Sequence, residues 1–207
     1  MKEKSKFRAV TYDPLLYIFL NPVRYEVAEM LISLEGTDKK ILDMCCGTGN
    51  QLKILAEHGF TDLCGVDISS AMTSVAKKNN HSIRIYTEDA ADTGFQSASF
   101  DIVLLSYSIH EKKPGTRTAL LKEAHRLLKK DGFLVIADYE FAEEIKPFTR
   151  LVIFFIERIA GKDHFRNFRH YCENDGLKGV VDSTKYEYMQ RRPVLFDSTV
   201  LSVLRKK

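Results

Sequence analysis

The feature that most constrains the fold is the alternation of short apolar runs with longer amphipathic runs across residues 39–140. Each apolar run has the length of a strand and is followed by polar or turn-forming residues. The predicted strands are KKILDM, DLCGVDI, SIRIYTED, SFDIVLLSYSIHE and FLVIADYE. Strands separated by helices or short connections favour a parallel sheet that is covered by helices on both faces. The helix before the last run is predicted to stop at Asp131–Gly132, because glycine commonly ends helices.

The alternation of apolar and amphipathic runs ends at Glu140. Two helices are predicted in succession, over about residues 146–159 and 163–173. The segments TKYEYMQRR and STVLSVLRKK then predict two strands joined by a short turn that contains Pro193. Because a hairpin cannot continue a purely parallel winding, it is expected to add an antiparallel pair at the edge of the sheet.

Composition and charge narrow the class of protein. A chain of 207 residues suits one globular domain, and a net charge of +3 with mixed signs is too weak to indicate a nucleic-acid-binding face. The four cysteines contain no CxxC pair, which argues against a metal or redox motif and favours reduced thiols. The apolar runs Leu15–Leu20 and Leu151–Ala160 are too short to span a bilayer. We therefore expect a cytoplasmic protein with at most peripheral membrane contact.

The residues just after the strands are the candidates for ligand binding, because open α/β sheets bind ligands beyond the carboxyl ends of their strands. Gly47 and Gly49 follow the first strand and allow a tight turn with close backbone approach to a ligand. Asp67 follows the second strand, about 20 residues on, where an acid accepts hydrogen bonds from ribose. Asp89 and Ala90 follow the third strand. Each has an ordinary reading as a turn, cap or loop residue, but their order and spacing together favour a nucleotide site.

Two kinds of nucleotide site compete for this pattern. A dinucleotide site requires G-x-G-x-x-G, and with Gly47 and Gly49 as the first pair the third glycine is replaced by Leu52. The pattern D-x-G-x-G-x-G instead places an acid at the strand end, where the cation S-adenosylmethionine binds, and Asp43 supplies that acid. Cys45 then takes the first glycine position, which its small side chain allows if the backbone there needs no positive φ.

Residues 39–139 resemble a class I S-adenosylmethionine-dependent methyltransferase. The resemblance rests on ILDMCCGTGN, GVDISSAM, EDAADTGFQSASFDIVLLSYSIHE and LLKEAHRLLKKDGFLVIADY, in that order. Within the superfamily the chain is similar to the ubiquinone/menaquinone C-methyltransferase-like branch (methyltransferase type 11), where cysteine is accepted at the first glycine and YD precedes an N-terminal helix, as in VTYDPLLY. DGF stands where many members have PGG, and the region after Glu140 matches the quinone enzymes poorly. The resemblance implies an α/β, Rossmann-like sheet of seven strands, mostly parallel, whose last two strands form the hairpin.

The resemblance also implies how individual residues bind the cofactor. The backbone around Gly47 and Gly49 would approach the methionine part, with Asp43 nearby, and Asp67 would hold the ribose hydroxyls. Asp89 would bond the adenine amino group. The Ala90 amide would meet a ring nitrogen, while Ser106 and Tyr107 would line the boundary with the substrate. The predicted cofactor-binding set is Asp43, Cys45, Gly47, Gly49, Asp67, Ile68, Asp89, Ala90, Ser106 and Tyr107.

Three residues are predicted to face the methyl acceptor. His110 follows the fourth strand, Tyr139 follows the fifth, and Tyr12 belongs to the N-terminal YDP segment. Each also has a structural explanation, as a loop histidine, a tyrosine packed at the sheet edge and an aromatic anchor of the first helix.

The second helix after Glu140 carries a polar cluster. His164, Asn167 and His170 are spaced three apart and therefore lie near one helix face. One interpretation is that His164 and Asn167 are polar residues of a lid that covers the substrate. The alternative is that they lie on the solvent-exposed face of an additional helical layer. No metal site is predicted, because His164 and His170 lack the i, i+4 spacing of helical histidine ligands.

The expected organisation is a single domain with an N-terminal helical cap (1–38), a cofactor-binding core (39–140), a helical lid insertion (141–176) and a terminal strand pair (177–207). The leading hypothesis is methyl transfer from S-adenosylmethionine, yielding S-adenosylhomocysteine, to a small or amphiphilic acceptor such as a quinone-like or other lipid-like molecule. The alternatives are an S-adenosylmethionine-binding regulatory or scaffold protein without turnover, and an NAD(P)-linked oxidoreductase. No nucleic acid partner is expected, and both a monomer and a homodimer fit the sequence.

Overall fold

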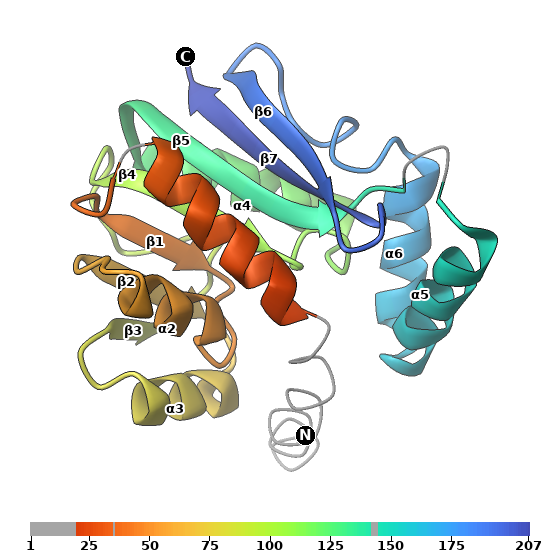
Figure 1. Cartoon of the computed structure of the whole chain (residues 1–207), viewed down its shortest axis with the longest axis horizontal. Helices are drawn as coiled ribbons and strands as arrows, with labels where there is room; N and C mark the ends of the chain where they lie inside the picture. Colours follow the sequence, from red (N-terminus) through yellow and green to blue (C-terminus); the bar gives the residue numbers. More distant parts are fainter. Residues whose placement is uncertain (1–19, 35, 142–144) are drawn as a thin grey trace.

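The computed structural model describes residues 20–34, 36–141 and 145–207. Its centre is a seven-stranded sheet with the strand order β3-β2-β1-β4-β5-β7-β6 (Figure 1). The strands are β1 (Ile41–Met44), β2 (Leu63–Asp67), β3 (Arg84–Thr87), β4 (Phe100–Ser106), β5 (Leu128–Tyr139), β6 (Tyr186–Val194) and β7 (Thr199–Lys206). The first five pair in parallel, and β7 pairs antiparallel with both β5 and β6. The predicted mostly parallel sheet with an antiparallel terminal hairpin is confirmed.

Helices cover both faces of the sheet. The helix of residues 20–34, α2 (Asn50–Glu57) and α3 (Ser70–Asn79) contribute to the core on one face, and α4 (Pro114–Leu127) and α6 (Lys162–Glu173) to the core on the other. Along β4, Ile102 and Leu104 point to the first group while Val103 and Leu105 point to the second. Burial on both faces explains why the strands are continuous apolar runs instead of alternating ones.

The end of α4 differs from the prediction. The helix ends at Leu127 and β5 begins at Leu128, so the helix does not reach Asp131–Gly132. Leu128 pairs with Phe100 of β4, and Lys206 Nζ donates to the carbonyl oxygens of His125 and Leu128 at 2.7 Å. These long-range contacts end the helix before the local sequence would.

The position of Pro193 also differs from the prediction. Pro193 lies inside β6, and the turn to β7 instead uses Leu195, Phe196 and Asp197, all with positive φ. Because β6 is an edge strand, a residue without an N–H is tolerated there.

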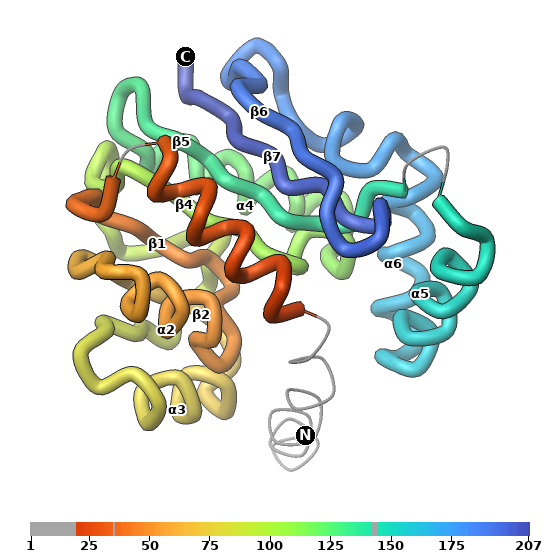
Figure 2. The backbone as a smooth tube through the Cα atoms, in the orientation of Figure 1, coloured from red at the N-terminus to blue at the C-terminus, as the bar shows by residue number. Residues whose placement is uncertain are grey.

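The two helices that follow β5 stand beyond the carboxyl end of that strand (Figures 1 and 2). They are α5 (Pro147–Ile159) and α6, which pack on each other. The inner face of α5 carries Ile153 and Glu157. Its outer side chains include the exposed Phe148, Leu151, Val152, Phe155 and Ile159. Despite this apolar stripe, no helix within the described ranges has the length and apolar character to cross a membrane.

Candidate active site

A cavity of about 640 Å³ lies at the carboxyl ends of the parallel strands. It is centred where the strand order reverses between β1 and β4, the usual ligand position in such sheets. The predicted site residues that line it are Asp43, Cys45, Gly47, Asp67, Ile68, Asp89, Ala90, Ser106, Tyr107, His110, Tyr139 and His164. Gly49 and Asn167 are not among the lining residues, and Tyr12 lies outside the described residues. One cavity therefore joins most of the predicted cofactor and acceptor residues.

The turn after β1 has three left-handed residues, including one that is not glycine. Gly47 and Gly49 have φ values of 55° and 78°, and Cys45 has a φ of 62°. The condition under which Cys45 was expected to replace glycine without strain is therefore not met, because the turn requires positive φ there. Burial raises the pKa of the Cys45 thiol to about 12, which keeps it protonated and weakly nucleophilic.

Gly49 serves packing between helices. It precedes α2, and a Cβ built on it would lie 2.8 Å from Asn80 Nδ2 and 3.1 Å from the Ala76 Cβ. A side chain at this position would therefore push α2 away from the end of α3. Gly47 differs, since a Cβ there would meet no atom within 4 Å and the residue faces the cavity.

Asp67, at the end of β2, ties two turns together. One carboxylate oxygen accepts from the Gly47 amide at 2.9 Å, and the other accepts from the Ser69 amide at 2.8 Å. Ser69 in turn caps α3 through a hydrogen bond from the Met72 amide. Because each carboxylate oxygen has two lone pairs, Asp67 keeps acceptor capacity toward the cavity.

Asp43 is an acid in an apolar setting. Its side chain is 2 % exposed at the end of β1, and burial raises its pKa to about 7. Arg24, on the helix of residues 20–34, opposes that rise, while Asp67 adds to it. A carboxyl group poised in this way gains most from a cation that binds in the cavity.

The end of the cavity that lies away from α5 and α6 has apolar side chains in its wall. Ile68 is 68 % exposed and lines the cavity, as does Met72 of α3. Asp89 holds its loop through the Ala91 amide at 2.9 Å, and Ala90 is buried beside it. An exposed apolar side chain next to a carboxylate acceptor suits a flat ring that carries a donor group.

Tyr107 is a strained residue in the wall of the cavity. Its φ is 49°, and its hydroxyl group hydrogen-bonds the Thr199 hydroxyl group of β7 at 2.9 Å. Its ring lies 5.5 Å from the ring of Tyr139 in an edge-to-face arrangement. The residue is thus fixed from two sides at the boundary between the two ends of the cavity.

Asp138, at the end of β5, holds His110 in one orientation. Its carboxylate accepts from the Ile109 amide at 2.9 Å, from the His110 amide at 3.2 Å and from the Tyr139 amide at 2.8 Å. His110 Nδ1 lies 2.6 Å from the same carboxylate, and since a carboxylate only accepts, Nδ1 carries the proton. Burial lowers the pKa of His110, but Asp138 and Glu157 outweigh it and the net pKa is raised.

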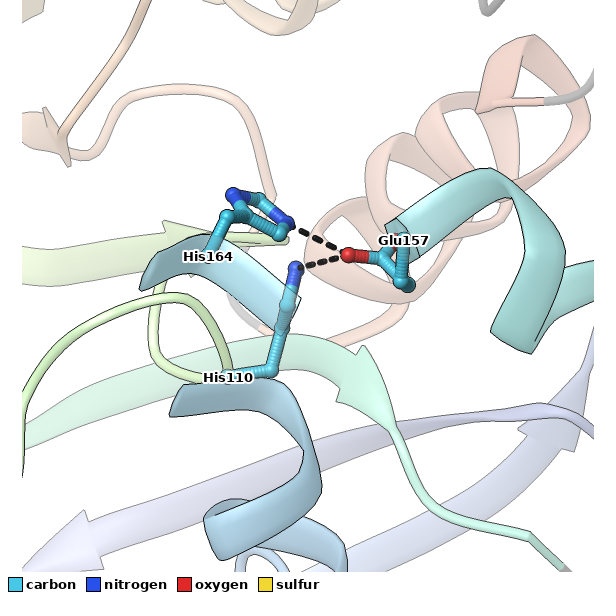
Figure 3. A group of neighbouring side chains, drawn as sticks. All are labelled: His110, Glu157 and His164. Carbon is cyan, nitrogen blue, oxygen red and sulfur yellow. Dashed lines mark hydrogen bonds and ion pairs between the residues drawn. The ribbon is translucent and has the colours of Figure 1, made fainter. Parts of the chain in front are cut away.

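Glu157 of α5 lies between two histidines (Figure 3). Its Oε2 contacts His164 Nε2 and lies 3.6 Å from His110 Nε2, and its side chain is 4 % exposed. His164 Nδ1 lies 3.2 Å from Glu111 Oε2. Although burial lowers the pKa of His164, Glu111 and Glu157 raise it to about 9.

Arg117 of α4 stabilises the backbone next to this cluster. Its guanidinium group donates to the carbonyl oxygens of Ile109, His110 and Asn167. Asn167 Nδ2 donates to the carbonyl oxygen of Glu111 at 2.8 Å. Asn167 therefore fixes α6 to the loop after β4. It was predicted to lie over the substrate, but it is not among the residues that line the cavity.

The charged residues in or beside the cavity that the sequence did not single out include Arg24, Glu111, Asp138 and Glu157. Asp138 and Glu111 immediately neighbour the predicted Tyr139 and His110, so strand-end position could have identified them. Glu157 carries a weaker signal. It is an acid at the end of the apolar run LVIFFI, where it resembles the solvated end of a helix.

Comparison with known proteins gives a consistent picture. The family model described as a methyltransferase domain matches residues 41–132. A ubiquinone/menaquinone biosynthesis C-methyltransferase from Campylobacter jejuni is 33% identical over 113 residues, 52% of this chain and 47% of that protein. A demethylmenaquinone methyltransferase from Thermotoga maritima is 30% identical over 116 residues, which are 56% of this chain and 49% of that protein. The chain spans about half the length of these curated relatives.

Two solved structures share the fold at low sequence identity. The PH0226 protein from Pyrococcus horikoshii superposes with a TM-score of 0.68 at 21% identity, covering 96% of this chain and 92% of that one. Magnesium protoporphyrin IX methyltransferase from Synechocystis, solved with S-adenosylhomocysteine, gives 0.64 at 17% identity, with 92% and 84% coverage. In its strand order, its strand-end acids and the methyltransferase domain matched over residues 41–132, the chain is similar to the class I S-adenosylmethionine-dependent methyltransferases, including their ubiquinone/menaquinone branch.

Proposed function

We propose that this protein transfers the methyl group of S-adenosylmethionine to a small polar acceptor bound beside His110, Glu157 and His164. The observation that carries the proposal is that a single cavity joins the acids at the ends of β1 and β2 to this buried polar cluster. A protein that only bound the cofactor would have no need of ionisable groups buried beyond the methyl position. Perturbed ionisable groups in a cleft are typical of catalytic sites.

The cofactor would occupy the end of the cavity formed by β1, β2 and β3. The Asp43 carboxylate would face the cationic methionine part, and Asp67 would accept from the ribose hydroxyl groups. Asp89 and the Ala90 amide would hold the adenine, whose face would rest on Ile68. This arrangement would direct the methyl group past Ser106 and Tyr107 toward His110.

The acceptor side of the cavity supports a polar substrate. Its described wall includes His110, Glu111, Lys112, Glu157 and His164. A prenylated quinol would need a long apolar wall for its tail, and these charged groups would be desolvated against it at a cost of several kcal/mol. The quinone-related relatives are named for their own substrates, and the matched family model ends at residue 132, before Glu157 and His164.

We assign α5 and α6 the role of a lid that completes the acceptor pocket. Glu157 and His164 come from these two helices, and Tyr139 comes from β5 beneath them. Methyl transfer from a sulfonium is an in-line displacement, so the protein mainly contributes positioning and a suitable electrostatic environment. The lid helices would provide both.

The cofactor assignment is tested by thermal denaturation with S-adenosylhomocysteine. A ligand that binds only the folded state raises the melting temperature with its concentration. Asp67→Ala should weaken binding roughly tenfold or more, because hydrogen bonds to a charged group contribute about 1.5–3 kcal/mol. Asp163→Ala, an exposed acid on α6, is the matched control and should bind like the wild type. No shift at saturating ligand would refute the assignment.

Transfer itself is tested by incubating the protein with S-adenosylmethionine labelled in its methyl group and a panel of phenols, amines, thiols and quinols. The proposal expects label in a small polar acceptor and none in a prenylated quinol. Binding without transfer to any class would favour the regulatory or scaffold alternative.

A further inference from the structure

The cluster at the acceptor end of the cavity brings together three side chains from three separate elements. His110 follows β4, Glu157 belongs to α5 and His164 belongs to α6. One potential ligand atom from each lies within 4.8 Å of the other two. Figure 3 places the Glu157 carboxylate between the Nε2 atoms of the two histidines.

We propose that His110 Nε2, His164 Nε2 and the Glu157 carboxylate form a binding site for a divalent transition-metal ion. Ligand atoms bound tetrahedrally at about 2.0–2.2 Å from an ion lie roughly 3.3–3.6 Å apart. The 3.6 Å between His110 Nε2 and Glu157 Oε2 already fits that spacing. His164, which contacts Glu157 directly, would need to withdraw from it to admit the ion.

The opposite nitrogen of each histidine is held by a second carboxylate. His110 Nδ1 lies 2.6 Å from Asp138, and His164 Nδ1 lies 3.2 Å from Glu111. Metal-bound histidines almost always donate their other ring N–H to such a partner, which fixes the tautomer and makes the ligating nitrogen more basic. Two independent carboxylate–histidine pairs therefore aim their Nε2 atoms at the same point.

The donor set indicates the class of metal. Two imidazoles and one carboxylate occur in zinc sites that keep an open position, and in the two-histidine-one-carboxylate sites of ferrous iron. All three residues line the cavity, so the remaining coordination positions would face the acceptor. His164 and His170 lie on one helix without the i, i+4 spacing of paired ligands. The three ligands proposed here come instead from three elements that the fold brings together.

A metal here would act on the acceptor, and this role rests on the proposed function. An acceptor hydroxyl bound to the ion would have a lowered pKa and would release its proton to water. The oxygen lone pair would then bond the methyl carbon as the carbon–sulfur bond breaks, which leaves the neutral thioether S-adenosylhomocysteine.

A proton on His164 Nε2 competes with the metal ion for the same position. With His164 protonated, Glu157 and Glu111 are paired by hydrogen bonds and the cluster needs no ion. The two states are exclusive, because an ion requires both Nε2 atoms to be unprotonated. Metal titration of the full chain distinguishes them.

The experiment adds Co²⁺ to the chelator-treated full-length protein without S-adenosylmethionine and follows the visible d–d absorption, with Zn²⁺ as competitor. The expected result is one saturable site with no sulfur-to-cobalt charge-transfer band. Glu157→Gln and His164→Gln should each weaken binding at least tenfold, and Glu111→Gln should weaken it by about 10–100-fold through its histidine. His170→Gln on the same helix is the matched control and should leave the affinity unchanged.

Folding and cofactor binding are checked for every variant by melting temperature with and without S-adenosylhomocysteine. Absence of a saturable site in the folded wild type would overturn the metal proposal. Binding that survives Glu157→Gln and His164→Gln but is lost in Cys45→Ser would also overturn it. Because the titration omits cofactor and acceptor, a metal site without methyl transfer would count against the proposed function alone.

Discussion

Asp43 is the cavity residue whose ionisation matters most for the proposed cofactor site, because its raised pKa lies near neutral pH. Its pKa of about 7 is set first by burial, with Arg24 lowering it and Asp67 raising it. At pH 6 the carboxyl group of the unbound protein is therefore mostly protonated, and at pH 8 mostly ionised. S-adenosylmethionine is a cation, so it binds the ionised form better.

We expect the affinity for S-adenosylmethionine to rise roughly tenfold from pH 6 to pH 8, as the ionised fraction of Asp43 rises by that factor. Isothermal titration calorimetry at a series of pH values measures this directly. In Asp43→Asn the affinity should be lower throughout and the pH dependence should disappear. A pH-independent affinity in the wild type would contradict the assignment of Asp43.

The same substitution provides a control on stability. The pKa of Asp43 is higher in the folded state than its usual 3.8, so the folded state loses stability as the pH rises from about 4 through 7. Above pH 7 the wild type carries a buried charge that Asp43→Asn lacks. The variant should therefore melt at a higher temperature than the unbound wild type at pH 8, and at a similar temperature at pH 4.

Cys45 carries strain that glycine would relieve. A residue other than glycine in the left-handed region destabilises the folded state by about 1–2 kcal/mol. Replacing it with glycine removes this strain but costs about 0.5–1 kcal/mol, because glycine makes the unfolded chain more flexible. Cys45→Gly should therefore raise the free energy of unfolding by about 0.5–1 kcal/mol, measured by urea denaturation. Cys172→Gly, in the interior of α6, should lower it by about 1 kcal/mol. A loss of stability in Cys45→Gly would show that the thiol's contacts outweigh the strain.

At the scale of elements, Phe168 is the aromatic side chain of α6 that packs against both α5 and β5. Phe168 is fully buried, and its ring centroid lies 5.1 Å from that of Phe154 of α5 and 5.5 Å from that of Tyr139 of β5. It also packs edge-on against His110 at 6.0 Å. The packing of α6 against α5 and β5 therefore depends in large part on this residue.

Phe168→Ala should lower the free energy of unfolding by about 3–5 kcal/mol, because it leaves a large cavity in a packed core. Phe155→Ala is the matched control, since Phe155 is an exposed aromatic residue on α5 and its loss should change stability by less than about 0.5 kcal/mol. Equal stabilities for the two variants, by guanidinium denaturation, would contradict the anchoring role of Phe168.

The elements were largely predictable from the sequence because strands buried on both faces are unbroken apolar runs. The errors occurred where distant contacts decide the outcome. Pairing of Leu128 with Phe100 ends α4 early, and the edge position of β6 admits Pro193. The left-handed turn at Cys45 was also not predictable, since the local sequence does not fix the path from β1 into α2.

On the scale of the whole molecule, the cavity joins two regions of different predictability. The cofactor end is built from strand ends, whose position in the sheet follows from the chain order. The acceptor end depends on how α5 and α6 are placed beyond the carboxyl end of β5, and the sequence predicted the two helices but not this placement. Glu157 was not singled out from the sequence, yet it lies between His110 and His164.

The place of β7 has a consequence for synthesis of the protein on the ribosome. β7 follows β6 in the chain but lies between β5 and β6 in the sheet. Until residues 199–206 have emerged, β5 has an unpaired edge and β6 has no partner. Exposed strand edges pair readily with other chains, so the nascent protein remains open to misassembly until β7 is available to fill the gap.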